Sequence, residues 1–168
     1  MKRSNFILVP LLLCASNAYA GEQLVNQAKG VGIKSCLPTI ADLEHFFTNK
    51  GTNYGSWSLW ASDKPDDQIF NSTLEITYSD GPVIVDLTVA PTKDQQCSYS
   101  YTRTWYSDQS CMAFTTSSMP GSSKYKMEVN KLVTAFEDDS AKWLLTTAGQ
   151  GCLIQKKEIG IRHKAQSL

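Results

Sequence analysis

Regular alternation of apolar and polar residues runs through most of the chain after Gly51 and limits the folds open to it. Residues 74–78 carry Leu, Ile and Tyr at every second position, and residues 83–89 repeat the pattern with Val and Leu. Asp80-Gly81 lies between these runs and is a typical hairpin turn. Because successive side chains of a strand point to opposite faces, the alternation predicts antiparallel strands with one buried face.

The stretch 97–111, CSYSYTRTWYSDQSC, continues this period and ends in a turn-forming run at 107–110. We therefore expect a regular strand there. One face would carry the residues at the odd positions, Cys97, Tyr99, Tyr101, Arg103 and Trp105. The tyrosines and Trp105 would lie under a helical segment, and Tyr106 would face solvent on the opposite, hydroxyl-lined face.

The segment before Gly51 has the period of helices instead. A short helix is expected over 22–29, and a firmer one opens at Pro38, places Ile40, Leu43 and Phe46 on one face and closes near Gly51. Further strands are expected at 112–116, 125–133, 143–147 and 152–158. The predicted fold class is α+β: an N-terminal helical segment packed on a curved antiparallel sheet of about seven or eight strands.

Residues 1–20 have the layout of a cleavable signal peptide. Lys2 and Arg3 precede an apolar run from Phe6 to Cys14, and Ala18-Tyr19-Ala20 supplies a small-x-small cleavage site. The run is shorter than the roughly 20 residues of a membrane-spanning helix. We expect cleavage after Ala20, one globular domain over 21–168, no membrane span, and a periplasmic or secreted bacterial location.

Charge argues against nucleic acid as a partner. The chain has 16 basic and 16 acidic residues, and loss of Lys2 and Arg3 with the signal lowers the basic count from 16 to 14. No basic run remains to follow a phosphate backbone or an anionic membrane surface.

Four cysteines remain after cleavage: Cys36, Cys97, Cys111 and Cys152. An even number in an exported chain predicts two disulfides, and no Cys-x-x-Cys pair points to a metal. Nearness in sequence favours Cys97–Cys111, whereas a regular strand would hold these two residues too far apart. Four cysteines allow three connectivities, and the end-to-end arrangement of a meander suggests Cys97–Cys152 with Cys36–Cys111, so the pairing stays open. No metal and no cofactor are expected.

These cysteines also carry a resemblance. A cysteine entering a helix, a Cys-aromatic strand that ends in a turn and a second cysteine, and the late run Gly149-Gln150-Gly151-Cys152 resemble a family of small uncharacterised bacterial exported proteins. The resemblance spans most of the mature chain. It implies no known activity, and no functional residue is carried over from it.

Catalytic equipment is sparse. Ser123 and Lys126 match a Ser-x-x-Lys motif, but they enter a strand pattern rather than the helix that this motif needs. His45 beside Glu44 is a candidate general base, although a histidine there is more often an exposed helix residue. The carboxylates at 137–139 are typical of a solvated turn. These observations favour a binding protein over an enzyme.

The aromatic residues supply the candidate binding positions. Tyr106, Arg103 and Trp60 are the residues we expect to contact a ligand, because exposed aromatics and arginine dominate binding surfaces. The expected function is an exported binding protein, inhibitor- or immunity-like, whose partner is another exported protein or an envelope component. The alternatives are a small cell-envelope hydrolase that uses carboxylates and His45, and an envelope assembly factor.

Overall fold

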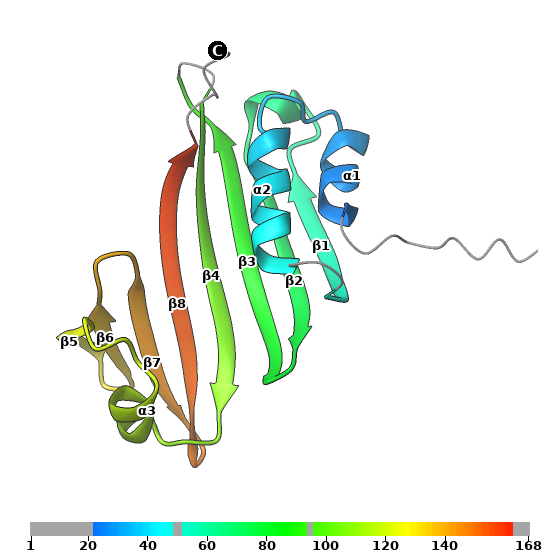
Figure 1. Ribbon diagram of the computed structural model, residues 1–168. Coiled ribbons are helices and arrows are strands. Elements are labelled where there is room, and N and C mark those ends of the chain that lie inside the picture. The colour runs from blue at the N-terminus through cyan, green and yellow to red at the C-terminus, as the bar shows by residue number, and fades with distance from the viewer. Residues whose placement is uncertain (1–21, 49–51, 94–95, 163–168) are drawn as a thin grey trace, which may run out of the picture.

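The computed structural model describes residues 22–48, 52–93 and 96–162, and it has the predicted α+β architecture. Helices α1 (Gln23–Gly30) and α2 (Leu37–Thr48) come first, followed by an eight-stranded antiparallel sheet that does not close into a barrel (Figure 1). The strands are β1 (Tyr54–Trp60), β2 (Phe70–Tyr78), β3 (Gly81–Pro91), β4 (Cys97–Ser107), β5 (Lys124–Asn130), β6 (Val133–Glu137), β7 (Lys142–Ala148) and β8 (Gly151–Arg162).

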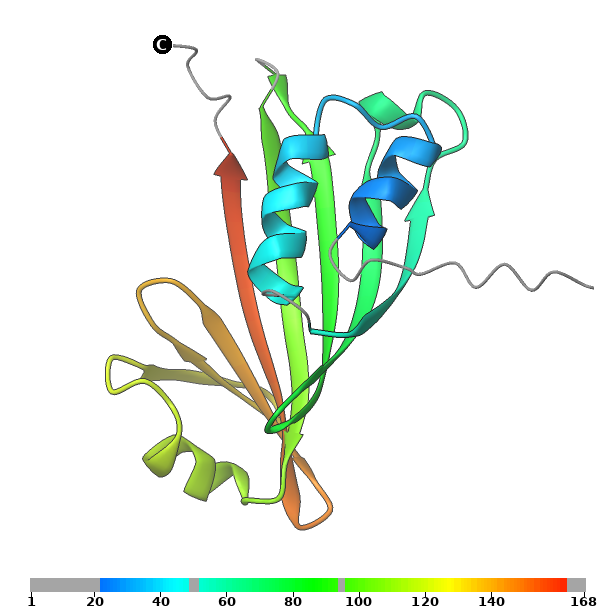
Figure 2. The ribbon, with the colours of Figure 1, turned by 45° about the vertical axis from the view of Figure 1, so that its right-hand side comes forward.

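The order of the strands in the sheet brings together segments that are far apart in the sequence. The order β1-β2-β3-β4-β8-β7-β6-β5 joins two four-stranded meanders through the pair of β4 and β8. These two strands pair along their whole length, from Cys97 opposite Arg162 to Ser107 opposite Cys152. The last strand in the sequence therefore lies in the middle of the sheet (Figure 2).

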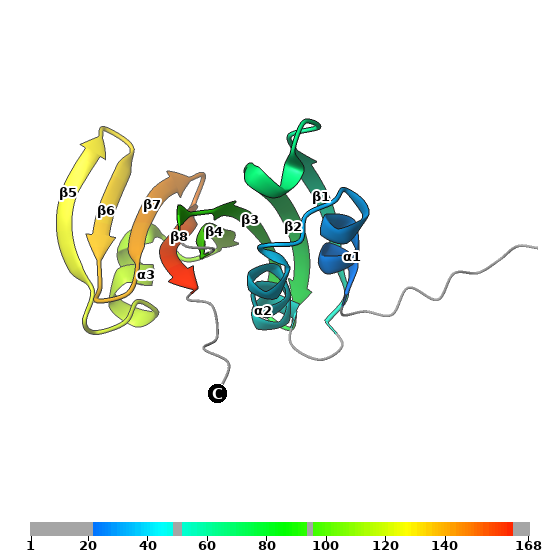
Figure 3. The ribbon, with the colours of Figure 1, turned by 90° about the horizontal axis from the view of Figure 1, so that it is seen from above.

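The helices cover one face of the sheet, which we call the helix face; the other is the open face. Helices α1 and α2 lie over β1 to β4, whereas α3 (Cys111–Ser117) lies beside the far half of the sheet (Figure 3). The first hydrophobic core fills the space under α1 and α2. Its most deeply buried members include Leu24, Ile40, Phe47, Leu74 and Leu87.

A second, smaller core lies under α3. It contains the buried residues Phe114, Trp143, Leu145 and Ile154, and Trp105 packs against it. The alternation predicted for residues 97–106 is confirmed, because Tyr101 is buried and Tyr106 is exposed. The expectation that Trp105 lies under the N-terminal helices is wrong, because the second core takes this residue instead.

Helix α3 occupies the place where a strand was predicted at 112–116. Ser110 caps this helix by accepting a hydrogen bond from the backbone N–H of Ala113 at 3.2 Å, and Phe114 turns inward. Serine favours the N-cap because its hydroxyl satisfies a free backbone N–H of the first turn. The single strand predicted over 125–133 is also wrong, because the chain turns between β5 and β6.

The two disulfides join Cys36 to Cys97 and Cys111 to Cys152, with Cα–Cα distances of 5.7 and 4.9 Å. This is the third of the three possible connectivities, so both of the pairings discussed from the sequence are wrong, although Cys97 and Cys111 are kept apart as the regular strand required. Cys97 and Cys152 lie at opposite ends of the β4–β8 ladder, so they cannot meet. Each disulfide instead ties the start of a helix to the start of a strand.

Glu44 of α2 fixes α1 in place. Its side chain is 1% exposed and accepts hydrogen bonds from the backbone N–H groups of Leu24 and Val25, each at 3.0 Å. The Tyr54 hydroxyl also donates to Glu44, and burial together with this bond raises the pKa of Tyr54. The first turn of a helix has backbone N–H groups without intrahelical acceptors, and Glu44 supplies acceptors for two of them.

The acidic residues at 137–139 lie where β6 ends and the chain turns into β7. Asp138 accepts hydrogen bonds from the backbone N–H groups of Ser140 and Ala141 and from the indole of Trp143 at 2.8 Å. The Trp143 bond contributes most to lowering the pKa of Asp138 from 3.8 to about 2. Asp138 and Asp139 therefore lie in a turn as predicted, whereas Glu137 is the last residue of β6.

The predicted signal at 1–20 and His163 lie outside the described residues. Within the ranges given above, no helix has both the length and the apolar character needed to cross a membrane.

Candidate binding groove between α2 and the sheet

Two tyrosine rings form the floor of a groove on the helix face. Tyr99 and Tyr101 follow each other on this face of β4, and their rings are nearly parallel, with an interplanar angle of 2° and centroids 6.4 Å apart. Gly160 of β8 lies opposite Tyr99. A Cβ atom at Gly160 would come within 2.4 Å of the Tyr99 hydroxyl oxygen, so the missing side chain lets the ring lie across β8.

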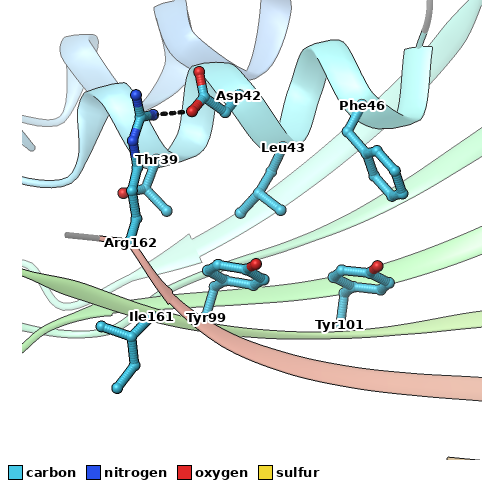
Figure 4. Close-up of a pocket in the computed structure, with 8 residues that line it drawn as sticks. All are labelled: Thr39, Asp42, Leu43, Phe46, Tyr99, Tyr101, Ile161 and Arg162. Atoms are coloured by element: carbon cyan, nitrogen blue, oxygen red, sulfur yellow. Dashed lines mark ion pairs between the residues drawn. The ribbon is translucent and has the colours of Figure 1, made fainter. Parts of the chain in front are cut away.

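Helix α2 provides the opposite wall. Leu43 and Phe46 point from α2 toward the two tyrosine rings (Figure 4). The space between them is an open pocket of about 370 Å³. Phe46 lines this pocket and still has 56% of its surface exposed, although a ring of this size is usually covered in a core. The floor and wall therefore present aromatic surface to an incoming group.

An ion pair closes one end of the groove. Arg162, at the end of β8, pairs with Asp42 of α2 (Figure 4), and it also donates to the backbone carbonyl of Pro38. Thr39 and Ile161 complete the pocket lining. The carboxylate, guanidinium and hydroxyl groups give this end polar contacts that fix the orientation of a ligand.

A partly buried charged cluster lies at the other end, where the two hydrophobic cores meet. Glu158 is placed between Arg103 Nη2 at 3.5 Å and Lys156 Nζ at 3.3 Å. Burial and a hydrogen bond to Glu158 raise the pKa of Tyr101. The Arg103 guanidinium carbon also lies 6.0 Å from the Phe46 ring centroid, within the range of a cation–π contact. The cluster is thus continuous with the tyrosine floor.

A second pocket, of about 460 Å³, adjoins the far side of Arg103. Tyr78, Asp80, Val83 and Trp105 are among its other lining residues. Arg103 Nε is buried and has no hydrogen-bond partner within the described part of the chain. Its Nη2 pairs with Glu158, so the described residues bond this guanidinium only in part.

The three binding residues predicted from the sequence do not come together. Arg103 lines the second pocket and contacts Phe46 at the end of the groove. Tyr106 lies on the open face with its hydroxyl 3.5 Å from the Ala148 carbonyl, and Trp60 ends the edge strand β1. Their roles in binding remain predictions. His45 is exposed on α2 and is not among the residues that line either pocket.

Sequence reasoning missed most of the groove. Tyr99 and Tyr101 were expected to be core residues, which holds for Tyr101 at 7% exposure, but the pocket above them was not foreseen. Gly160 was the available signal, because a glycine inside a strand pattern often marks a close approach by another group.

Comparison of the chain with protein-family models, curated proteins and solved structures gives no match. Among the described residues, no group of three His, Cys, Asp or Glu side chains is arranged to hold a metal ion. The groove itself is therefore the basis for assigning a function.

Proposed function

We propose that this chain is an exported, disulfide-stabilised binding protein, and that the groove between α2 and strands β4 and β8 holds its partner. The partner is another exported protein or an envelope component, and the protein acts in the periplasm or outside the cell. The signal-like residues 1–20 and the two disulfides support this location, because disulfides persist in oxidising compartments. The resemblance to small exported four-cysteine proteins agrees with it.

The observation that carries the proposal is the tyrosine floor facing an exposed phenylalanine. Gly160 allows the Tyr99 ring to lie flat, and α2 holds Phe46 above the floor without filling the space. Concave sites with apolar walls and a few placed polar groups are where ligands bind. Arg162 and Arg103 stand at the two ends, so an apolar segment with polar groups on either side matches the groove.

The hydrolase alternative depends on carboxylates that face one cleft. Along this groove, Glu158 is paired with Arg103 and Lys156, and Asp42 is paired with Arg162. Each of these carboxylates already has a cationic partner, which is the arrangement of a structural ion pair. The geometry therefore favours binding over acid–base catalysis.

The test is capture of a partner by the tagged mature protein, residues 21–168, from a periplasmic extract of the producing bacterium, with identification by mass spectrometry. Phe46→Ala should abolish capture without unfolding the protein, because Phe46 is 56% exposed. Leu132→Ala is the matched control, since Leu132 is 74% exposed and lies between β5 and β6, and Tyr106→Ala tests the open face, where Tyr106 is 52% exposed. Loss of the partner with Tyr106→Ala but not with Phe46→Ala would move the binding surface to the open face and contradict the groove.

A further inference from the structure

The two edges of the open sheet are built differently. Strand β1 is one edge and reads Tyr-Gly-Ser-Trp-Ser-Leu-Trp, with no charged residue and no proline. It pairs with β2 without a register shift along its seven residues. Trp57, Leu59 and Trp60 are 75%, 57% and 46% exposed. An edge strand with this composition is a template for pairing with another strand.

Strand β5, the other edge, carries the features that prevent such pairing. It contains Lys124, Lys126 and Glu128, and its register with β6 shifts twice. Charged side chains and bulges are the devices by which proteins block edge-to-edge association. The sheet is therefore protected at one edge and unprotected at the other.

The helix face of β1 is already occupied. Gln27 of α1 hydrogen-bonds to the hydroxyls of Ser56 and Ser58, at 3.0 and 2.6 Å. Trp57 and Leu59, which alternate with these serines, therefore lie on the open face. The exposed apolar surface of the edge thus consists of the open-face side of β1 and its last residue.

We propose that β1 pairs in antiparallel fashion with β1 of a second copy of this chain, with the two-fold axis at Trp57, so that one continuous sheet runs through the dimer. In that register each residue meets a residue of the same kind or of complementary size. The facing pairs are Trp57 with Trp57, Ser56 with Ser58, Gly55 with Leu59 and Tyr54 with Trp60.

This complementarity is the reason for choosing a second copy as the occupant. The small Gly55 faces the larger Leu59 and Trp57 faces Trp57, whereas the side chains of Tyr54, Ser56 and Ser58 are bonded within their own chain and leave these positions to backbone pairing. No like charges meet, because β1 has none. Cross-strand aromatic pairs stabilise a sheet, and a two-fold interface needs a self-complementary surface of this kind. The proposal does not depend on the groove, which β4, β8 and α2 form elsewhere in the fold.

Sedimentation equilibrium of the mature, oxidised protein over a series of concentrations tests the proposal. The wild type should show twice the mass of one chain, and Trp57→Lys should reduce it to one chain by placing like charges opposite each other at the two-fold axis. Leu132→Lys is the matched control, because Leu132 is 74% exposed and lies between β5 and β6, on the protected side of the sheet. This control should remain a dimer.

Cysteine cross-linking tests the register. Residues directly opposite in an antiparallel pair have Cα atoms about 4.5–5.5 Å apart, which a disulfide can bridge. Trp57→Cys should give a covalent dimer on mild oxidation, whereas Leu59→Cys should not, because each Leu59 faces Gly55 of the other copy. A wild type that is monomeric at all concentrations overturns the dimer, and cross-linking through Leu59→Cys in place of Trp57→Cys overturns the register.

Discussion

Removal of the buried Glu44 carboxyl group should cost a large part of the stability of the domain. Three donors meet at this group: the backbone N–H groups of Leu24 and Val25 and the hydroxyl of Tyr54. In Glu44→Ala, the Leu24 N–H keeps the Tyr54 oxygen at 3.2 Å as an acceptor. The Val25 N–H and the Tyr54 O–H lose the acceptors that the structure gives them.

The size of the effect follows from these two donors. A buried donor without a partner costs about 1–3 kcal/mol, so Glu44→Ala should lower the free energy of unfolding by roughly 2–6 kcal/mol. A domain of this kind is stable by only about 5–15 kcal/mol, so the variant should be close to unfolding. Glu44→Gln keeps the side-chain volume and one acceptor oxygen, and it should cost less than Glu44→Ala.

Urea denaturation followed by tryptophan fluorescence measures both variants. Glu75→Gln is the control, because Glu75 is exposed on β2 and its replacement should change the free energy of unfolding by no more than about 0.5 kcal/mol. The prediction is contradicted if the free energy of unfolding of Glu44→Ala lies within about 1 kcal/mol of the wild-type value and the denaturant slope is unchanged. That result would mean that water or another group satisfies the donors of α1.

Three further predictions concern the cores, the disulfides and pH. Tyr101→Ala should cost about 3 kcal/mol or more, and Tyr106→Ala should leave the free energy of unfolding nearly unchanged, as measured by urea denaturation; the reverse order would contradict the assigned faces. Replacing Cys111 and Cys152 together by Ser should cost about 2–4 kcal/mol by the same assay, and an unchanged midpoint would refute a stabilising bridge. The pKa of Asp138 is about 2 in the folded protein and 3.8 as its ordinary value, so the stability that it contributes is present above about pH 4 and is lost as the pH falls through about 2. Acid unfolding of Asp138→Asn should therefore depend less on pH in that window, and an unchanged profile would exclude the role of Asp138.

The sequence predicts the parts of the fold that depend on local periodicity. Alternation in residues 74–78, 83–89 and 97–106 indicates β2, β3 and β4 with the correct buried faces, because a period of two fixes the direction of each side chain. The short helix α3 was missed because Ser110, which caps it, was assigned to the turn instead. The local pattern does not separate a one-face helix of this length from a short strand.

The disulfide pairing and the groove depend on contacts between distant segments. Cys152 meets Cys111 because β8 pairs with β4, and no local pattern states that β8 skips over β5 to β7 to reach that position. The groove depends on the same pairing, since Gly160 of β8 makes room for Tyr99 of β4. Glu44 was overlooked for a similar reason, because its role is fixed by how α1 packs on α2.

The central place of β8 also constrains the order in which the chain can fold. Residues 151–162 are the last strand in the sequence, yet they join β4 to β7 and hold the two halves of the sheet together. During synthesis from the N-terminus, Cys36 and Cys97 are both available before Cys152 has been made. Cys111 must wait for Cys152, its partner in the folded protein. We therefore expect the Cys36–Cys97 bridge to form before the Cys111–Cys152 bridge. Until β8 inserts, β4 and β7 each present an unpaired edge, and this interval is when the protein is most exposed to aggregation.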